Sequence, residues 1–62
     1  MHNIDPQPGE VYEGIDGGKM YIVARCRDIV EFTRRPTMDS YEPRIYRRRL
    51  RTFERMATMR LK

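Results

Sequence analysis

The residues of this chain that are best suited to chemistry with a partner are its arginines. Eleven of the thirteen cationic side chains are arginine, and the densest run lies in residues 44–62, where Glu54 is the single acid. The planar guanidinium group matches phosphates and carboxylates with paired hydrogen bonds and stacks on bases, whereas lysine would serve solubility equally well. The composition therefore predicts an anionic partner, with nucleic acid as the first expectation and an acidic protein surface as the second.

The candidate binding residues come from two parts of the chain. Two arginines end the clearest strand pattern, and the others follow Pro43. Tyr46 and Tyr21 lie next to arginines on expected exposed faces and are candidates for stacking on bases. A solvated basic face without a partner is the competing interpretation. The predicted binding residues are Arg25, Arg27, Tyr46, Arg47, Arg48, Arg49, Arg51 and Arg55.

Side chains suited to catalysis or to metal binding are few. His2 is the only histidine, and Ser40, the only serine, has no histidine or lysine nearby in sequence to activate it. Cys26 is the only cysteine and lies on the expected core face of a strand, where a thiol is inert. One histidine and one cysteine do not give the ligand spacing of a zinc site, and the glycines fit neither phosphate-loop pattern. We therefore expect a non-enzymatic protein without cofactor or metal.

Length and composition indicate one small domain over residues 1–62. The net charge of +4 is unevenly distributed, because residues 1–24 hold four acids and one cation, Lys19. No run approaches the roughly 20 apolar residues that span a bilayer, and the first residues lack the features of a signal peptide. A single cysteine fits a reducing compartment. These features predict a cytoplasmic protein with no membrane partner, and they leave the oligomeric state open.

The chain before residue 44 has the pattern of antiparallel strands. Residues 1–8, with two prolines, are expected to form an extended lead-in, and residues 36–43 a loop. Between them, residues 9–35 alternate in polarity, and Asp16-Gly17-Gly18 is a strong turn signal. Met20, Ile22, Ala24 and Cys26 are expected to share a buried face. The whole expected core is Val11, Met20, Ile22, Ala24, Phe32, Leu50 and Phe53.

The basic segment 44–62 admits two interpretations. Apolar residues recur at spacings of three and four from Tyr46 to Leu61, which is typical of one amphipathic helix that begins after Pro43. On that interpretation the arginines at 47, 51 and 55 form a row on one exposed face. Alternatively, residues 44–48 form a strand, and a short helix begins near Leu50.

The order of these segments resembles that of small bacterial and phage proteins with an SH3-like barrel. The resemblance covers residues 8–57 and rests on PGEVYEG, a Gly-Gly turn, KMYIVARCRDIVEF, a loop and IYRRRLRTFERM. Among these proteins, the chain especially resembles an uncharacterised family that has an aromatic residue, an arginine-proline-leucine sequence and a phenylalanine near its C-terminus. Tyr46, Leu50 and Phe53 match three of these positions, whereas Arg49 stands where the family often has proline.

The resemblance implies a mainly β or α+β fold, namely a small SH3-like antiparallel barrel or sheet with a C-terminal helix. It favours a strand followed by a short helix in residues 44–62. The family carries no settled activity, so the function is predicted from the arginines. We expect a nucleic-acid-binding accessory protein of bacterial or phage origin. The alternative is a protein-interaction module, such as a phage-encoded inhibitor that docks its arginines on an acidic patch of a host protein.

Overall fold

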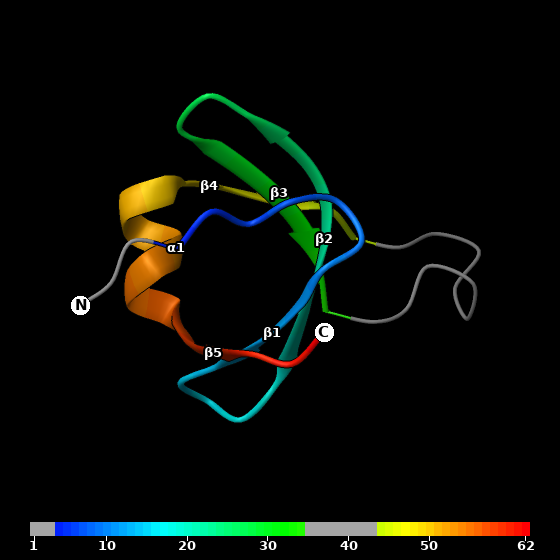
Figure 1. Cartoon of the computed structure of the whole chain (residues 1–62), viewed down its shortest axis with the longest axis vertical. Coiled ribbons are helices and arrows are strands. Elements are labelled where there is room, and N and C mark those ends of the chain that lie inside the picture. Colours follow the sequence, from blue (N-terminus) through cyan, green and yellow to red (C-terminus); the bar gives the residue numbers. More distant parts are fainter. Residues whose placement is uncertain (1–3, 35–43) are drawn as a thin grey trace.

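The computed structural model describes residues 4–34 and 44–62, and the predicted loop at 36–43 lies outside them. Its elements are β1 (Val11–Gly14), β2 (Lys19–Cys26), β3 (Ile29–Thr33), β4 (Tyr46–Arg49), α1 (Leu50–Met56) and β5 (Ala57–Arg60). The strands form one antiparallel sheet in the order β4-β3-β2-β1-β5 (Figure 1). The prediction of a mainly β domain with antiparallel strands in residues 11–33 is therefore confirmed.

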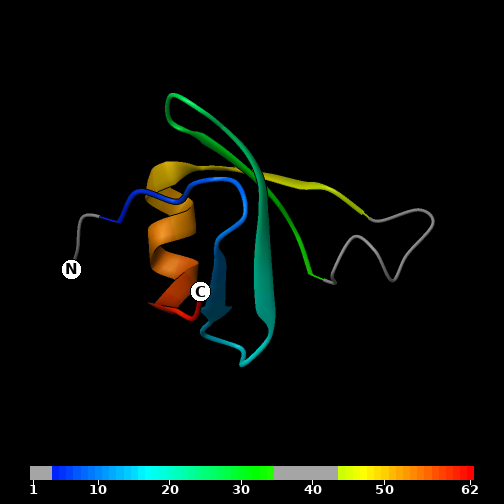
Figure 2. The same cartoon turned by 45° about the vertical axis from the view of Figure 1, so that its right-hand side comes forward.

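The sheet is curved, and it does not close into a barrel. Its two edges are β4 and β5, which are not paired with each other. Figures 1 and 2 show α1 beside the inner face of the curved sheet, between these two edge strands. Within the described parts of the chain, no helix is long and apolar enough to cross a membrane.

The core is built on the inner face of the sheet, which we define as the face that packs against Phe53 of α1. The ring of Phe53 meets the rings of Tyr12 and Phe32 edge-on, with centroids 5.4 and 5.5 Å apart. Offset and edge-on ring contacts of this kind favour tight packing. The buried hydrophobic residues are Tyr12, Met20, Ile22, Val30, Phe32 and Phe53. Four of them belong to the predicted core, while Leu50 is half-buried and packs against the cluster.

The predicted facing of β1 is wrong. Tyr12 and Gly14 point inward, Val11 is only half-buried, and Ile15 is 72% exposed. The Tyr12 hydroxyl donates a hydrogen bond to the Glu10 carboxylate at 3.0 Å, so its ring can be buried while its polar end is satisfied. The alternation of residue types in this short strand fits either facing, and the tyrosine ring fills the core.

A β-bulge in β2 overturns the prediction that Ala24 and Cys26 are core residues. Ile22 pairs with Phe32, but Ala24 pairs with Glu31, so Val23 is an extra residue without a partner on β3. An extra residue reverses which side chains point inward beyond it. Past the bulge Arg25 therefore lies on the inner face opposite Val30, whereas Cys26 is exposed.

The C-terminal segment confirms the strand followed by a short helix and adds a strand that was not predicted. The chain is extended again at Ala57 (φ −91°, ψ 135°), and β5 pairs with β1 through Tyr12 and Arg60. The Ile15 amide donates to the Met56 carbonyl at 2.8 Å, which ties the end of α1 to the first strand. Four largely exposed residues carry no strong strand pattern, so β5 depends on the backbone edge of β1.

The described part of the predicted lead-in belongs to the packed structure. Residues 4–8 contain no helix or strand. Pro6 is nonetheless fully buried, and Ile4 packs against the core. The Gly9 amide, at a left-handed φ of 94°, donates to the Ile22 carbonyl at 3.1 Å and thereby anchors the lead-in to β2.

Candidate functional site

Six of the seven predicted binding arginines lie on the β2–β3 turn, on β4 and on α1, and we call this surface the arginine corner. The turn and the helix are joined there, because the first amide of α1, at Leu50, donates a hydrogen bond to the Asp28 carbonyl. Pairing of β3 with β4 then places Arg49 opposite Ile29, directly after the turn. The arginine corner consists of Arg27, Arg47, Arg48, Arg49, Arg51 and Arg55.

The three consecutive arginines of β4 do not share one face of the sheet. Arg47 pairs in register with Glu31, and Arg49 with Ile29, on the outer face. Arg48 lies opposite the buried Val30 and therefore belongs to the inner face, at its margin. All three side chains are exposed, because β4 is an edge strand.

Two of these arginines have carboxylate partners. The Arg47 Nε atom is 3.0 Å from a Glu31 carboxylate oxygen, and an Arg49 guanidinium nitrogen is 3.7 Å from Asp28. Both guanidinium groups are more than two-thirds exposed, at 71% and 74%. Ion pairs in such positions contribute about 0–1 kcal/mol, so neither arginine is held firmly in its pair.

Tyr46 is already engaged by neighbouring side chains. Its ring stacks on Phe32 with centroids 5.4 Å apart and planes inclined by 14°. The Arg48 guanidinium carbon lies 5.8 Å from the Tyr46 ring centroid, and an Arg48 nitrogen donates to the Arg47 carbonyl at 2.7 Å. A base that stacked on Tyr46 would therefore compete with Arg48 for the ring. Tyr46 acts here as the edge of the core and as a platform that positions Arg48.

The helical arginines and the turn arginine are not neutralised. Arg51 and Arg55 are exposed and four residues apart on α1, so they lie on one face of the helix. Arg27 is exposed in the β2–β3 turn at a left-handed φ of 55°. Within residues 4–34 and 44–62, these three arginines and Arg48 form no ion pair.

Arg25 was predicted as a binding residue, but its side chain is held within the fold and is not one of the exposed arginines of the corner. Its side chain is only 17% exposed and forms an ion pair with Asp5 at 2.6 Å. The same guanidinium donates to the Pro6 carbonyl at 3.3 Å and, through Nε, to the Arg27 carbonyl at 2.7 Å. These contacts show that Arg25 fastens the lead-in over the inner face of the sheet.

Tyr21 also lies apart from the arginine corner. It is half-buried on the outer face, in register with Val11 on one side and Thr33 on the other. Glu31, which pairs with Arg47, is two residues further along β3 than Thr33. Tyr21 and the β4 arginines therefore do not form one contiguous set in the register of the sheet.

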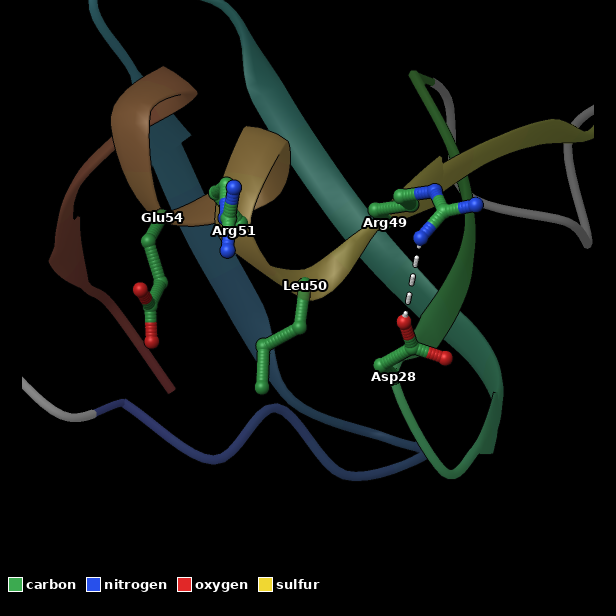
Figure 3. A pocket seen from close by; sticks show the side chains of 5 residues that line it. All are labelled: Asp28, Arg49, Leu50, Arg51 and Glu54. Carbon is green, nitrogen blue, oxygen red and sulfur yellow. Dashed lines mark ion pairs between the residues drawn. The ribbon is translucent and has the colours of Figure 1, made fainter.

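A pocket of about 320 Å³ opens beside the start of α1, within the arginine corner. It is lined by Asp28, Arg49, Leu50, Arg51 and Glu54 (Figure 3). Sequence reasoning treated Glu54 only as the single acid of the basic segment and gave Asp28 no part in a binding site. Their position in a pocket depends on the hydrogen bond between the Asp28 carbonyl and the Leu50 amide, which residue spacing does not reveal.

A second polar cluster joins the two ends of the chain. The Glu10 carboxylate accepts hydrogen bonds from the Gln7 amide, the Tyr12 hydroxyl and the Arg60 guanidinium, each at 3.0 Å. The Gln7 amide is the main cause of a lowered Glu10 pKa, and the donors Tyr12 and Arg60 also lower it. Burial, together with the Glu10 carboxylate, raises the pKa of Tyr12 to about 12. We assign this cluster a structural role between β1 and β5.

Neither metal ligands nor known relatives define a further site. In the described part of the chain, no group of three or more histidine, cysteine, aspartate or glutamate side chains could hold a metal ion. Ser40, considered above for catalysis, and His2 lie outside the described residues. No protein-family model matches the chain, and neither a curated protein nor a solved structure matches it.

Proposed function

We propose that this protein is a non-enzymatic nucleic-acid-binding module that contacts phosphates through the arginine corner. The observation that carries the proposal is the uncompensated charge of that surface. The six exposed arginines are accompanied by three acids: Asp28, Glu31 and Glu54. Of these six arginines, only Arg47 and Arg49 form ion pairs within the described residues. Guanidinium groups without carboxylate partners are free to neutralise phosphates and to release condensed counterions, which dominates nucleic-acid affinity.

The arrangement of these arginines suits an extended phosphate backbone better than a single ion. The β4 arginines point to both sides of an edge strand, and those of α1 continue beyond its end. Cations that are spread along one side of a small domain can contact successive phosphates of one nucleic-acid strand, as in small β-rich binding modules. An SH3-like arrangement that stays open between β4 and β5 is part of this proposal, and two features support it: the strand order β4-β3-β2-β1-β5 and the short helix before the last strand.

A protein partner is the second candidate function, and the open edge of β4 favours it. Among the described residues, β4 pairs only with β3, so one side of its backbone carries unpaired donors and acceptors. An extended acidic segment of a host protein could add to this edge and place its carboxylates beside the arginines. This complex would require backbone pairing, which binding to phosphates does not.

The decisive experiment measures binding of a single-stranded RNA, a single-stranded DNA and a duplex by fluorescence anisotropy at about 50 and 200 mM salt. The Arg51→Ala/Arg55→Ala protein should bind all three more weakly, with a salt slope smaller by about one unit for each lost contact, because phosphate contacts do not read sequence. The matched control is Lys19→Ala/Lys62→Ala, which removes the same charge outside the arginine corner, at the start of β2 and after β5.

The results separate the two candidate functions. Equal losses in both double variants would show that only net charge matters and would contradict a defined surface. Binding that is undetectable for the parent protein at either salt concentration would exclude the nucleic-acid proposal. Capture of an acidic protein from nuclease-treated lysate, lost when Tyr46–Arg49 is altered, would then favour the second candidate.

A further inference from the structure

The pocket in the arginine corner contains carboxylates where a phosphate-binding surface would be expected to contain only donors. Asp28 and Glu54 lie on opposite sides of Leu50 in the view of Figure 3, with Arg49 and Arg51 also on the lining. Two carboxylates and two guanidinium groups cancel in charge. Such a lining does not favour a bare anion. It suits a ligand that has both hydrogen-bond donors and a neighbouring negative charge.

Glu54 is the carboxylate that is free to bind such a ligand. Its side chain is half-buried, and it forms no ion pair and no hydrogen bond with the described residues, although Arg51 and Arg55 are close in sequence on the same helix. Asp28, by contrast, is already opposite Arg49 at 3.7 Å. A carboxylate in a partly closed site accepts hydrogen bonds more strongly than one in open water.

We propose that this pocket binds a guanine base of a single-stranded nucleic acid, with the Glu54 carboxylate accepting hydrogen bonds from the base. The inference rests on the proposed nucleic-acid function and adds a base preference to it. Guanine presents two adjacent donors, N1–H and the N2 amino group, which match the two oxygens of one carboxylate. Leu50 forms an apolar surface for the base plane, and Arg51 and Arg49 bind the flanking phosphates.

The other bases fit this lining less well. Adenine and cytosine each present an amino donor beside an acceptor nitrogen, and that nitrogen would face a carboxylate oxygen unfavourably. Uracil has one N–H donor between two carbonyl oxygens. The pocket volume of about 320 Å³ is at the lower end of the range for small-molecule sites, which is sufficient for one base.

The test uses single-stranded RNA nonamers of eight uridines with guanosine, inosine, adenosine, cytidine or uridine at the centre. We expect the guanosine strand to bind roughly ten-fold more tightly than the adenosine, cytidine and uridine strands, within the range for a bidentate base contact. Inosine lacks the N2 amino group and should lose most of this preference. Guanosine monophosphate alone should bind far more weakly than the strand, because it lacks the flanking phosphates; equal affinity would overturn recognition within a strand.

The key variant is Glu54→Gln, which keeps the size of the side chain and removes one of its two acceptor oxygens. It should abolish the preference for guanosine while the all-uridine strand binds at least as well as to the parent. Glu13→Gln is the matched control, since Glu13 also forms no ion pair among the described residues but lies on β1. A preference that persists in Glu54→Gln overturns the inference. Equal affinity of the parent for all five strands overturns the guanine pocket alone, and no binding to any strand overturns the proposed function as well.

Discussion

Arginine side chains in this protein differ in role according to the groups that the fold places beside them. Arg25 contacts Asp5, the Pro6 carbonyl and the Arg27 carbonyl, and it serves the structure. Arg51 is equally cationic, but it is exposed and has no carboxylate partner in the described chain. The sequence identifies both as cations. The bulge at Val23 turns Arg25 inward, whereas Arg51 lies on an exposed face of α1.

Arg27 combines an exposed side chain with a strained backbone. Replacing it with glycine should therefore stabilise the fold and weaken binding. Its φ of 55° lies in the left-handed region, which disfavours residues with a Cβ by roughly 1–2 kcal/mol. Arg27→Gly should therefore raise the free energy of unfolding by up to about 1 kcal/mol, since glycine also loses more backbone entropy. It should also weaken nucleic-acid binding.

Arg27→Ala is the control for this prediction, because it removes the same side chain without relieving the backbone. Urea unfolding of the two variants and the parent measures the difference. If the glycine variant is no more stable than the alanine variant, the turn does not carry the strain described above.

At the scale of secondary structure, turn chemistry made the first hairpin predictable. In the β1–β2 turn the Asp16 carboxylate accepts a hydrogen bond from the Gly18 amide at 2.9 Å, and Gly17 has a φ of 85°. Glycine and aspartate encode these geometries directly, so the strands on either side could be placed from sequence. The bulge in β2 could not be predicted, since Val23 lies in a continuous apolar run from Met20 to Ala24 that gives no sign of an extra residue. Strand β5 was missed because its stability comes from pairing with β1, 43 residues or more away in sequence.

The junction of β1 and β5 should weaken in acid, because the ionised Glu10 carboxylate joins Tyr12 of β1 to Arg60 of β5. Its folded-state pKa lies below the ordinary value of 4.5, mainly through the Gln7 amide. A carboxyl group with a lowered pKa stabilises the fold above its unfolded pKa, and this contribution is lost as pH falls through the folded pKa. The parent should therefore be more stable than Glu10→Gln at pH 7, and the difference should shrink progressively as pH falls below 4.5 and through the folded-state pKa of Glu10.

Thermal unfolding of both proteins between pH 3 and pH 7 measures this difference. Glu13→Gln, within β1, is the control, because the Glu13 carboxylate forms no ion pair among the described residues. A constant gap between parent and Glu10→Gln across the range would mean that the carboxylate charge does not contribute to the junction.

For the whole molecule, the distribution of ion pairs explains why positive charge remains at one corner. Three acids of the N-terminal segment, Asp5, Glu10 and Asp16, pair with Arg25, Arg60 and Arg34 respectively. Three arginines outside the corner, Arg25, Arg34 and Arg60, are thus neutralised by the acidic end of the chain. The sequence predicts the charge asymmetry, but the pairs span 18 to 50 residues and depend on the fold. The register of the sheet therefore decides which cations remain for a partner.

Amide chemical-shift mapping tests the central claim most directly. A ¹⁵N-labelled sample is titrated with the guanosine-centred RNA nonamer, and each backbone amide is followed. We expect the largest shift changes in the Arg27–Asp28 turn, in β4 and in α1, with little change in β5 or in the β1–β2 turn. The largest changes at β5 or around Tyr21, or no changes at saturating RNA, would contradict binding through the arginine corner.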